Sequence, residues 1–174
     1  MNTENRIQNI ERTSFGFEGK MDCPAFQRTM DVMIDKEDDI EYAQKCADYL
    51  CNMPESTLLR LCTYSIRYCE EFRSILMPED MPVPEHISGK QILEYFRPNV
   101  LIVERPEDPS VIGFHVECGC DWEPEHGLEF TIKDDKILYV GSFDDMPAWS
   151  EGRLSYAGFY DPNNDMNMNY ADKE

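Results

Sequence analysis

The spacing of apolar residues changes twice along this chain, and this change limits the folds that the chain can form. In residues 25–35, side chains two positions apart share one face, which is mostly apolar and therefore typical of a half-buried strand. The residues on that face are Phe26, Arg28, Met30, Val32 and Ile34. Residues 13–21 are expected to pair with this strand as a hairpin. In residues 36–53 the apolar spacing becomes three and four, which predicts an amphipathic helix.

A second helix and a short third helix are predicted before the chain returns to strands. Residues 55–76 keep the helical spacing. Their buried stripe is expected to consist of Leu59, Cys62, Ile66, Cys69, Phe72 and Leu76. Residues 92–96 are predicted as the third helix, because Ser88 and Gln91 fit a capping box before them. Pro98 is expected to end that helix.

Four short alternating segments predict the rest of the sheet. They are residues 100–104, 111–118, 128–133 and 136–141. Short, turn-rich connections between them favour an antiparallel meander. The predicted fold class is therefore α+β, with an antiparallel sheet made of an N-terminal hairpin plus a C-terminal meander and about three helices packed on it.

A chain of 174 residues suits one domain, which we expect to occupy residues 13–150. Residues 1–12 are polar and are expected to form a disordered arm. Residues 151–174 are rich in acidic residues and asparagine and show no period, so they are expected to form a flexible tail.

Charge and cysteine use bear on partners and location. The 35 acidic residues outnumber 16 lysines and arginines, and the net charge of −19 disfavours binding to nucleic acid or an anionic membrane. A basic protein partner would be attracted instead, and the alternative is that the charge serves solubility, as in many acidic cytosolic proteins. The count of seven cysteines is odd, the N-terminus is polar, and no apolar run approaches the roughly 20 residues that span a bilayer. These features predict a cytoplasmic protein.

The segment CGCDWEPEHG, which follows a predicted strand, holds the candidate site residues. A metal site there would use Cys118, Cys120 and His126 as ligands. Asp121 or Glu125 would supply the fourth ligand. Structural zinc sites, however, usually pair cysteines two to four residues apart and gather four ligands from two such pairs, whereas this segment offers a single C-x-C. The sequence therefore predicts no metal.

A cysteine nucleophile with His126 as its base is the second interpretation of the same segment. Nine acidic residues lie between positions 117 and 145, against the two lysines Lys133 and Lys136. Such a negative field raises a thiol pKa and disfavours the reactive thiolate. No catalytic residue is therefore predicted.

A third interpretation treats the segment as an anchored turn. Trp122 would bury a large apolar surface, His126 would form a hydrogen bond across the loop, and Gly127 would adopt a positive φ before the next strand. Binding by an exposed loop is the alternative, and it would involve Asp121, Trp122, Glu123, Glu125 and His126.

One pattern spans this segment and the hairpin after it. It consists of Trp122, Glu125, His126, Gly127, Val140 and Gly141. The pattern resembles the signature of a family of uncharacterised bacterial cytoplasmic proteins with a domain of unknown function, in which Trp-Asp-x-Glu-His-Gly follows a strand and precedes a hairpin ending in Val-Gly. Glu123 stands where that family usually has Asp. The resemblance extends over residues 13–141 and implies no established chemistry. By analogy alone, similar small acidic proteins occur as suspected immunity proteins that neutralise toxins.

We therefore expect a non-enzymatic interaction protein without a cofactor, in the form of an immunity-type protein that binds a basic partner. One alternative is a metal-dependent or thiol hydrolase centred on residues 118–126. Another is a module that binds a small ligand.

Overall fold

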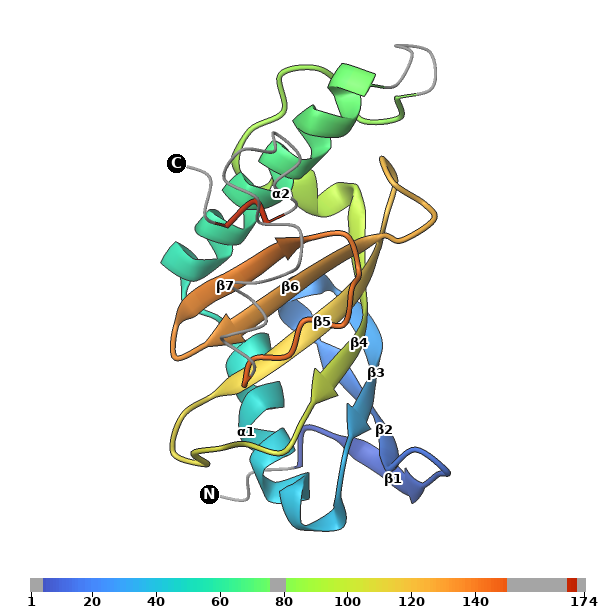
Figure 1. Cartoon of the computed structure of the whole chain (residues 1–174), viewed down its shortest axis with the longest axis vertical. Helices are drawn as coiled ribbons and strands as arrows, with labels where there is room; N and C mark the ends of the chain where they lie inside the picture. Colours follow the sequence, from blue (N-terminus) through green and yellow to red (C-terminus); the bar gives the residue numbers. More distant parts are fainter. Residues whose placement is uncertain (1–4, 76–80, 150–168, 172–174) are drawn as a thin grey trace.

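The computed structural model describes residues 5–75, 81–149 and 169–171. Within these residues the fold is one sheet whose strands lie in chain order (Figure 1). The strands are β1 (Gln8–Arg12), β2 (Phe17–Cys23), β3 (Arg28–Ile34), β4 (Phe96–Val103), β5 (Gly113–Cys120), β6 (Leu128–Lys133) and β7 (Lys136–Gly141). All neighbouring strands are antiparallel except β3 and β4, which are parallel because the chain passes through the helices between them.

In the view of Figure 1, the shorter α-helix lies behind the sheet near β5 and the longer one runs along the edge beside β7. They are α1 (Ile40–Cys51) and α2 (Glu55–Ile75), with short 3-10 helices at Pro24–Phe26, Glu37–Asp39 and Gly89–Glu94. Alternate residues of the central strands point toward the helices and form the core. In β5 these are Phe114, Val116, Cys118 and Cys120. No helix in the described part of the chain has the length and apolar character needed to cross a membrane.

The opposite face of the sheet is covered near β5 and β6 by an irregular stretch that follows β7. We call residues 142–149 the covering segment; Figure 1 shows it crossing in front of the strands. Thr131 of β6 is fully buried beneath it and donates a hydrogen bond from Oγ1 to the carbonyl oxygen of Met146, at 2.7 Å. The sheet therefore has buried side chains on both faces in this region.

Much of the predicted architecture is confirmed. The structure is α+β, with an N-terminal hairpin of β2 and β3 and a C-terminal meander from β4 to β7. Both β6 and β7 have the predicted bounds. The capping box of Ser88 and Gln91 is present as well.

Two predictions near the ends of the chain need correction. Residues 1–12 were expected to be a disordered arm, but Gln8–Arg12 forms β1 on the free edge of β2. Residues 151–174 were expected to be a flexible tail, but Tyr170 is 2 % exposed and its backbone N–H donates to the carbonyl oxygen of Val140 at 2.8 Å. Within that tail, residues 151–168 and 172–174 lie outside the described residues.

The helices also differ from prediction in detail. The predicted third helix is a 3-10 helix over Gly89–Glu94, and β4 already begins at Phe96. Pro98 lies inside β4 next to a register shift, where a missing backbone N–H is tolerated.

In α2 the buried face is rotated toward Leu58, Leu61 and Tyr68, while Leu59 is 41 % exposed. The buried face also includes the polar residues Thr57 and Ser65, which a pattern of apolar residues cannot identify. Leu76 lies outside the described residues.

Candidate binding site

The turn between β5 and β6 is anchored by the burial of Trp122. Its side chain is 1 % exposed, and its ring lies edge-on to Tyr68 of α2 and to Phe96 of β4, with centroid distances of 5.8 and 6.5 Å. On one side of it, the Asp121 backbone N–H donates to the carbonyl oxygen of Tyr95 at 2.9 Å. Trp122 therefore has the structural position predicted for it and cannot contact a partner directly.

Glu123 organises the rest of the turn. Its carboxylate accepts hydrogen bonds from the backbone N–H groups of Glu125 and His126, at 3.2 and 2.7 Å, and His126 Nδ1 lies 3.4 Å from the same carboxylate. The Glu123 side chain is only 7 % exposed, whereas that of His126 is 64 % exposed. The His126 ring is therefore within hydrogen-bonding distance of a carboxylate in the same turn.

Gly127 requires a conformation that other residues rarely adopt. Its φ is +68°, and a Cβ at this position would lie 2.2 Å from the carbonyl oxygen of Cys118. Its own carbonyl oxygen accepts a hydrogen bond from Tyr68 Oη at 3.2 Å. The glycine lets the chain pass close to β5 before β6 begins.

The predicted set of metal ligands is not brought together. Among the described residues, the group whose ligand atoms lie within 4.8 Å of one another is Glu123, Glu125 and His126, and it contains neither Cys118 nor Cys120. Both cysteines are 2 % exposed. Because the Glu123 carboxylate already accepts two backbone hydrogen bonds, this group fits the role of a turn better than that of a metal site.

Burial also lowers the reactivity of the Cys118 and Cys120 thiols. It raises the pKa of Cys118 well above its ordinary value and raises the pKa of Cys120 to about 12. Both groups are therefore protonated at neutral pH, and a protonated thiol is a poor nucleophile.

We expect Cys118 and Cys120 in the native protein to react with iodoacetamide at least about 100-fold more slowly than in guanidinium-unfolded protein at the same mildly alkaline pH. Only the thiolate reacts, and in the folded state its population rises only as the pH approaches the raised pKa. Mass spectrometry of the alkylated peptides over time measures both rates. Equal rates in the folded and unfolded protein would reopen the interpretation of a cysteine nucleophile.

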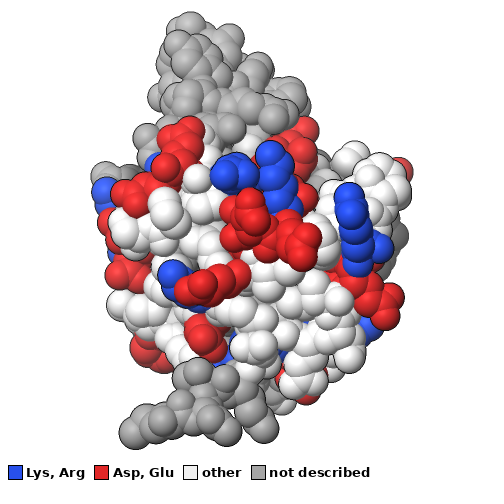
Figure 2. Space-filling model, turned by 90° about the horizontal axis from the view of Figure 1, so that it is seen from below, with Lys and Arg blue, Asp and Glu red and all other residues white. Residues whose placement is uncertain are grey.

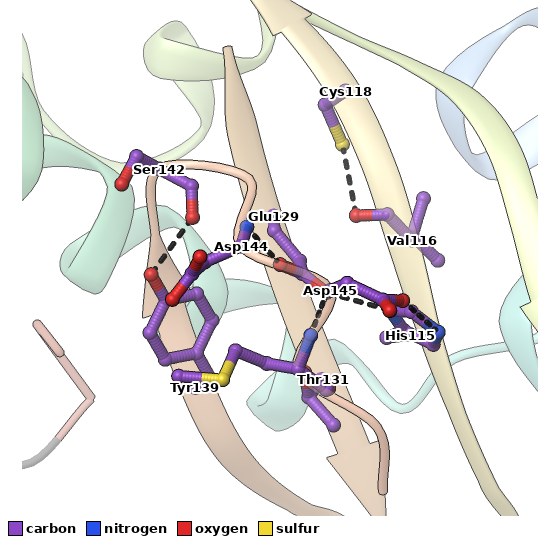
Figure 3. Close-up of polar contacts among 10 residues, drawn as sticks. His115, Val116, Cys118, Glu129, Thr131, Tyr139, Ser142, Asp144 and Asp145 are labelled. Carbon is purple, nitrogen blue, oxygen red and sulfur yellow. Dashed lines mark hydrogen bonds and ion pairs between the residues drawn. The ribbon is translucent and has the colours of Figure 1, made fainter. Parts of the chain in front are cut away.

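A second polar cluster, which the sequence did not indicate, lies under the covering segment (Figure 3). His115 of β5 and Glu129 of β6 are both fully buried, and His115 Nδ1 lies 2.5 Å from Glu129 Oε1. On its other side, His115 Nε2 lies 4.0 Å from a carboxylate oxygen of Asp145. Buried polar groups are usually hydrogen-bonded, and Glu129 is hydrogen-bonded to His115 Nδ1, whereas His115 Nε2 has no hydrogen-bond partner among the described residues. The cluster therefore has a structural role.

That role is to hold the covering segment in place. Glu129 accepts backbone hydrogen bonds from Asp144 at 2.9 Å and from Met146 at 2.8 Å, in addition to its contact with His115. Tyr139 of β7 adds a hydrogen bond from Oη to the carbonyl oxygen of Ser142 at 2.7 Å (Figure 3). The start of the covering segment is therefore fixed at several points.

A pocket of about 240 Å³ lies where the turn, α2 and the covering segment meet. Its lining residues are Tyr68, Phe72, Glu123, His126, Tyr139, Ser142, Phe143 and Asp144. The Phe143 backbone N–H donates to the carbonyl oxygen of His126 at 3.3 Å, which joins the two loops around the pocket. Burial raises the pKa of Tyr68 and of Tyr139, so both hydroxyls remain protonated donors.

The pocket brings together part of the predicted site. Glu123 and His126 line it, while Glu125 is exposed on the same turn. Asp121 instead forms an ion pair with Arg97, at 2.6 Å between Nη1 and Oδ1. The aromatic walls from α2 and β7 were not predicted, because nothing in the local sequence places α2 beside this end of the sheet.

The chain belongs to a family that is defined by sequence alone. The sequence matches the family described as Domain of unknown function (DUF6985) over residues 6–147. The match starts just before β1 and includes the turn, the pocket residues and most of the covering segment. No match was found among curated proteins or among solved structures.

Proposed function

We propose that this protein is a non-enzymatic interaction protein that binds a basic protein partner, such as a toxin domain that it neutralises. The observation that carries the proposal is a pair of exposed carboxylates, Asp144 in the pocket lining and Glu125 on the adjoining turn, which form no ion pair with a lysine or arginine among the described residues. Unpaired carboxylates retain their full attraction for a cationic partner.

The overall charge supports the same proposal. The net charge is −19, and Figure 2 shows carboxylate groups spread over one end of the molecule with lysine and arginine groups beside some of them. A protein with this charge attracts basic proteins over a distance and speeds their encounter, and this effect weakens as salt is added.

The burial of Cys118 and Cys120 weighs against the rival thiol hydrolase, since both side chains are inaccessible and protonated. All seven cysteines are free, which agrees with a reducing compartment. The bacterial cytoplasm is the setting that we propose, in line with the family resemblance of the sequence.

The test is affinity capture from a native lysate with the full chain as bait, at low and moderate salt, followed by binding measurements with each purified partner. We expect a basic protein whose affinity falls about tenfold or more between the two salt concentrations. The double variant Glu125→Gln/Asp144→Asn should weaken binding to that protein.

A matched control removes the same amount of charge elsewhere. Glu11 and Glu18 are exposed cross-strand neighbours on β1 and β2, at the opposite edge of the sheet from the pocket. The variant Glu11→Gln/Glu18→Gln should therefore bind the partner nearly as well as the wild type. If no specific basic protein is captured at either salt concentration, the proposed function is wrong.

A further inference from the structure

We propose that the pocket between the turn, α2 and the covering segment receives one lysine or arginine side chain of the partner. This inference rests on the proposed function and adds the chemical group that the pocket recognises. Its basis is the combination of aromatic walls with carboxylates at one small cavity.

Aromatic rings form the walls of the pocket. Tyr68 and Phe72 lie one turn apart on α2, with ring centroids 5.3 Å apart and planes at 87°. Tyr139 and Phe143 contribute from β7 and from the covering segment. The accessible rings are the half-buried Phe72 and Phe143, since Tyr68 and Tyr139 are 0 % and 1 % exposed. Ring faces attract cations, and the aliphatic part of a lysine or arginine side chain packs well against the same surface.

Carboxylates supply the charge that a cation would meet. Asp144 lines the pocket with its side chain free of any ion pair among the described residues, and Glu123 lines it while only 7 % exposed. A guanidinium or ammonium group between rings and carboxylates would gain both kinds of attraction. An anionic ligand would be repelled by the same groups.

The size of the pocket fits a single side chain. Its volume of about 240 Å³ lies below the range of roughly 300–1,000 Å³ that is typical of sites for small-molecule ligands. A lysine or arginine side chain fits within this volume.

The pocket is held in shape before any partner arrives. Asp144 and Met146 donate backbone hydrogen bonds to the buried Glu129, and Tyr139 donates to the carbonyl oxygen of Ser142 (Figure 3). Because these contacts fix the backbone around Asp144, little ordering is required when a cation binds, and a preorganised site binds more tightly.

The direct test is an NMR titration of the ¹⁵N-labelled full chain with Nα-acetyl-lysine N-methylamide. Its matched probe is Nα-acetyl-norleucine N-methylamide, which has a comparable apolar chain and no charge. We expect saturable shifts of the His126, Phe143 and Asp144 amides with the lysine probe alone. Absence of saturable shifts, or equal binding of the norleucine probe, would overturn the proposal.

Two substitutions locate the interaction. Asp144→Asn should raise the dissociation constant of the lysine probe about fivefold or more, because it removes a charge at the pocket. Glu11→Gln is the control: it removes the same charge from an exposed residue of β1, at the opposite edge of the sheet from the pocket. Equal effects of the two substitutions would contradict a specific contact at the pocket.

The proposed function and this inference can fail separately. If a basic partner is captured but binds the Asp144→Asn variant as tightly as the wild type, the pocket is not its contact and the inference fails alone. If the lysine probe binds saturably while no basic partner is captured, the pocket has the proposed chemistry and the broader function is wrong.

Discussion

Trp122→Ala is expected to lower the free energy of unfolding by about 3–5 kcal/mol, which is the usual cost of removing a large buried aromatic side chain. The indole is 1 % exposed and packs edge-on against Tyr68 and Phe96. Its Nε1 has no hydrogen-bond partner among the described residues, so the loss is one of packing. Urea unfolding followed by circular dichroism measures the change.

His126→Ala provides the control within the same turn. The His126 side chain is 64 % exposed, and a surface substitution of this kind changes the free energy of unfolding by about 0.5 kcal/mol. A large difference between the two variants would show that the turn is held by the indole. An unchanged urea midpoint for Trp122→Ala would mean that the structural role assigned to Trp122 is wrong.

Glu129→Ala is expected to have a comparable cost, about 3–5 kcal/mol, because it removes a fully buried carboxyl group and leaves its partners without a hydrogen-bond acceptor. Those partners are His115 and the backbone N–H groups of Asp144 and Met146. We also expect the Asp144 and Met146 amides to exchange with solvent much faster, since the covering segment loses its anchor. Hydrogen exchange measured by NMR separates this local opening from global unfolding.

Glu117→Ala is the matched control for this prediction. Glu117 lies directly across from Glu129 in the β5–β6 register and is half-exposed. Removing its carboxylate should therefore have little effect on either stability or exchange. If Glu129→Ala behaves like Glu117→Ala, the buried pair does not anchor the covering segment.

The parts of the fold that local sequence determines were predicted well. Alternation and the Asp134–Asp135 turn define β6 and β7, and the Ser88–Gln91 capping box depends only on neighbouring residues. β1 was missed because its residues are exposed or half-buried, so no alternation marks it. It forms because β2 offers a free edge, which is a property of the folded sheet.

The candidate site was predicted only in part, for the same reason. Trp122, His126 and Gly127 could be assigned from one short segment, since a turn is a local structure. The His115–Glu129 pair lies on the second face of the sheet, and its burial depends on the covering segment that follows β7. The aromatic walls of the pocket depend on α2 lying beside β7, which no local pattern indicates.

The contact between the C-terminal residues and β7 bears on where a functional unit of this chain should be taken to end. The family match ends at residue 147, yet Asn169 Oδ1 accepts the Val140 backbone N–H at 3.2 Å and Asn169 Nδ2 donates to the carbonyl oxygen of Leu138 at 2.9 Å. The Tyr170 backbone N–H donates a further hydrogen bond to the carbonyl oxygen of Val140. A protein cut at the family boundary would expose unpaired main-chain groups along β7, and such an edge is a template for pairing with other chains and for aggregation.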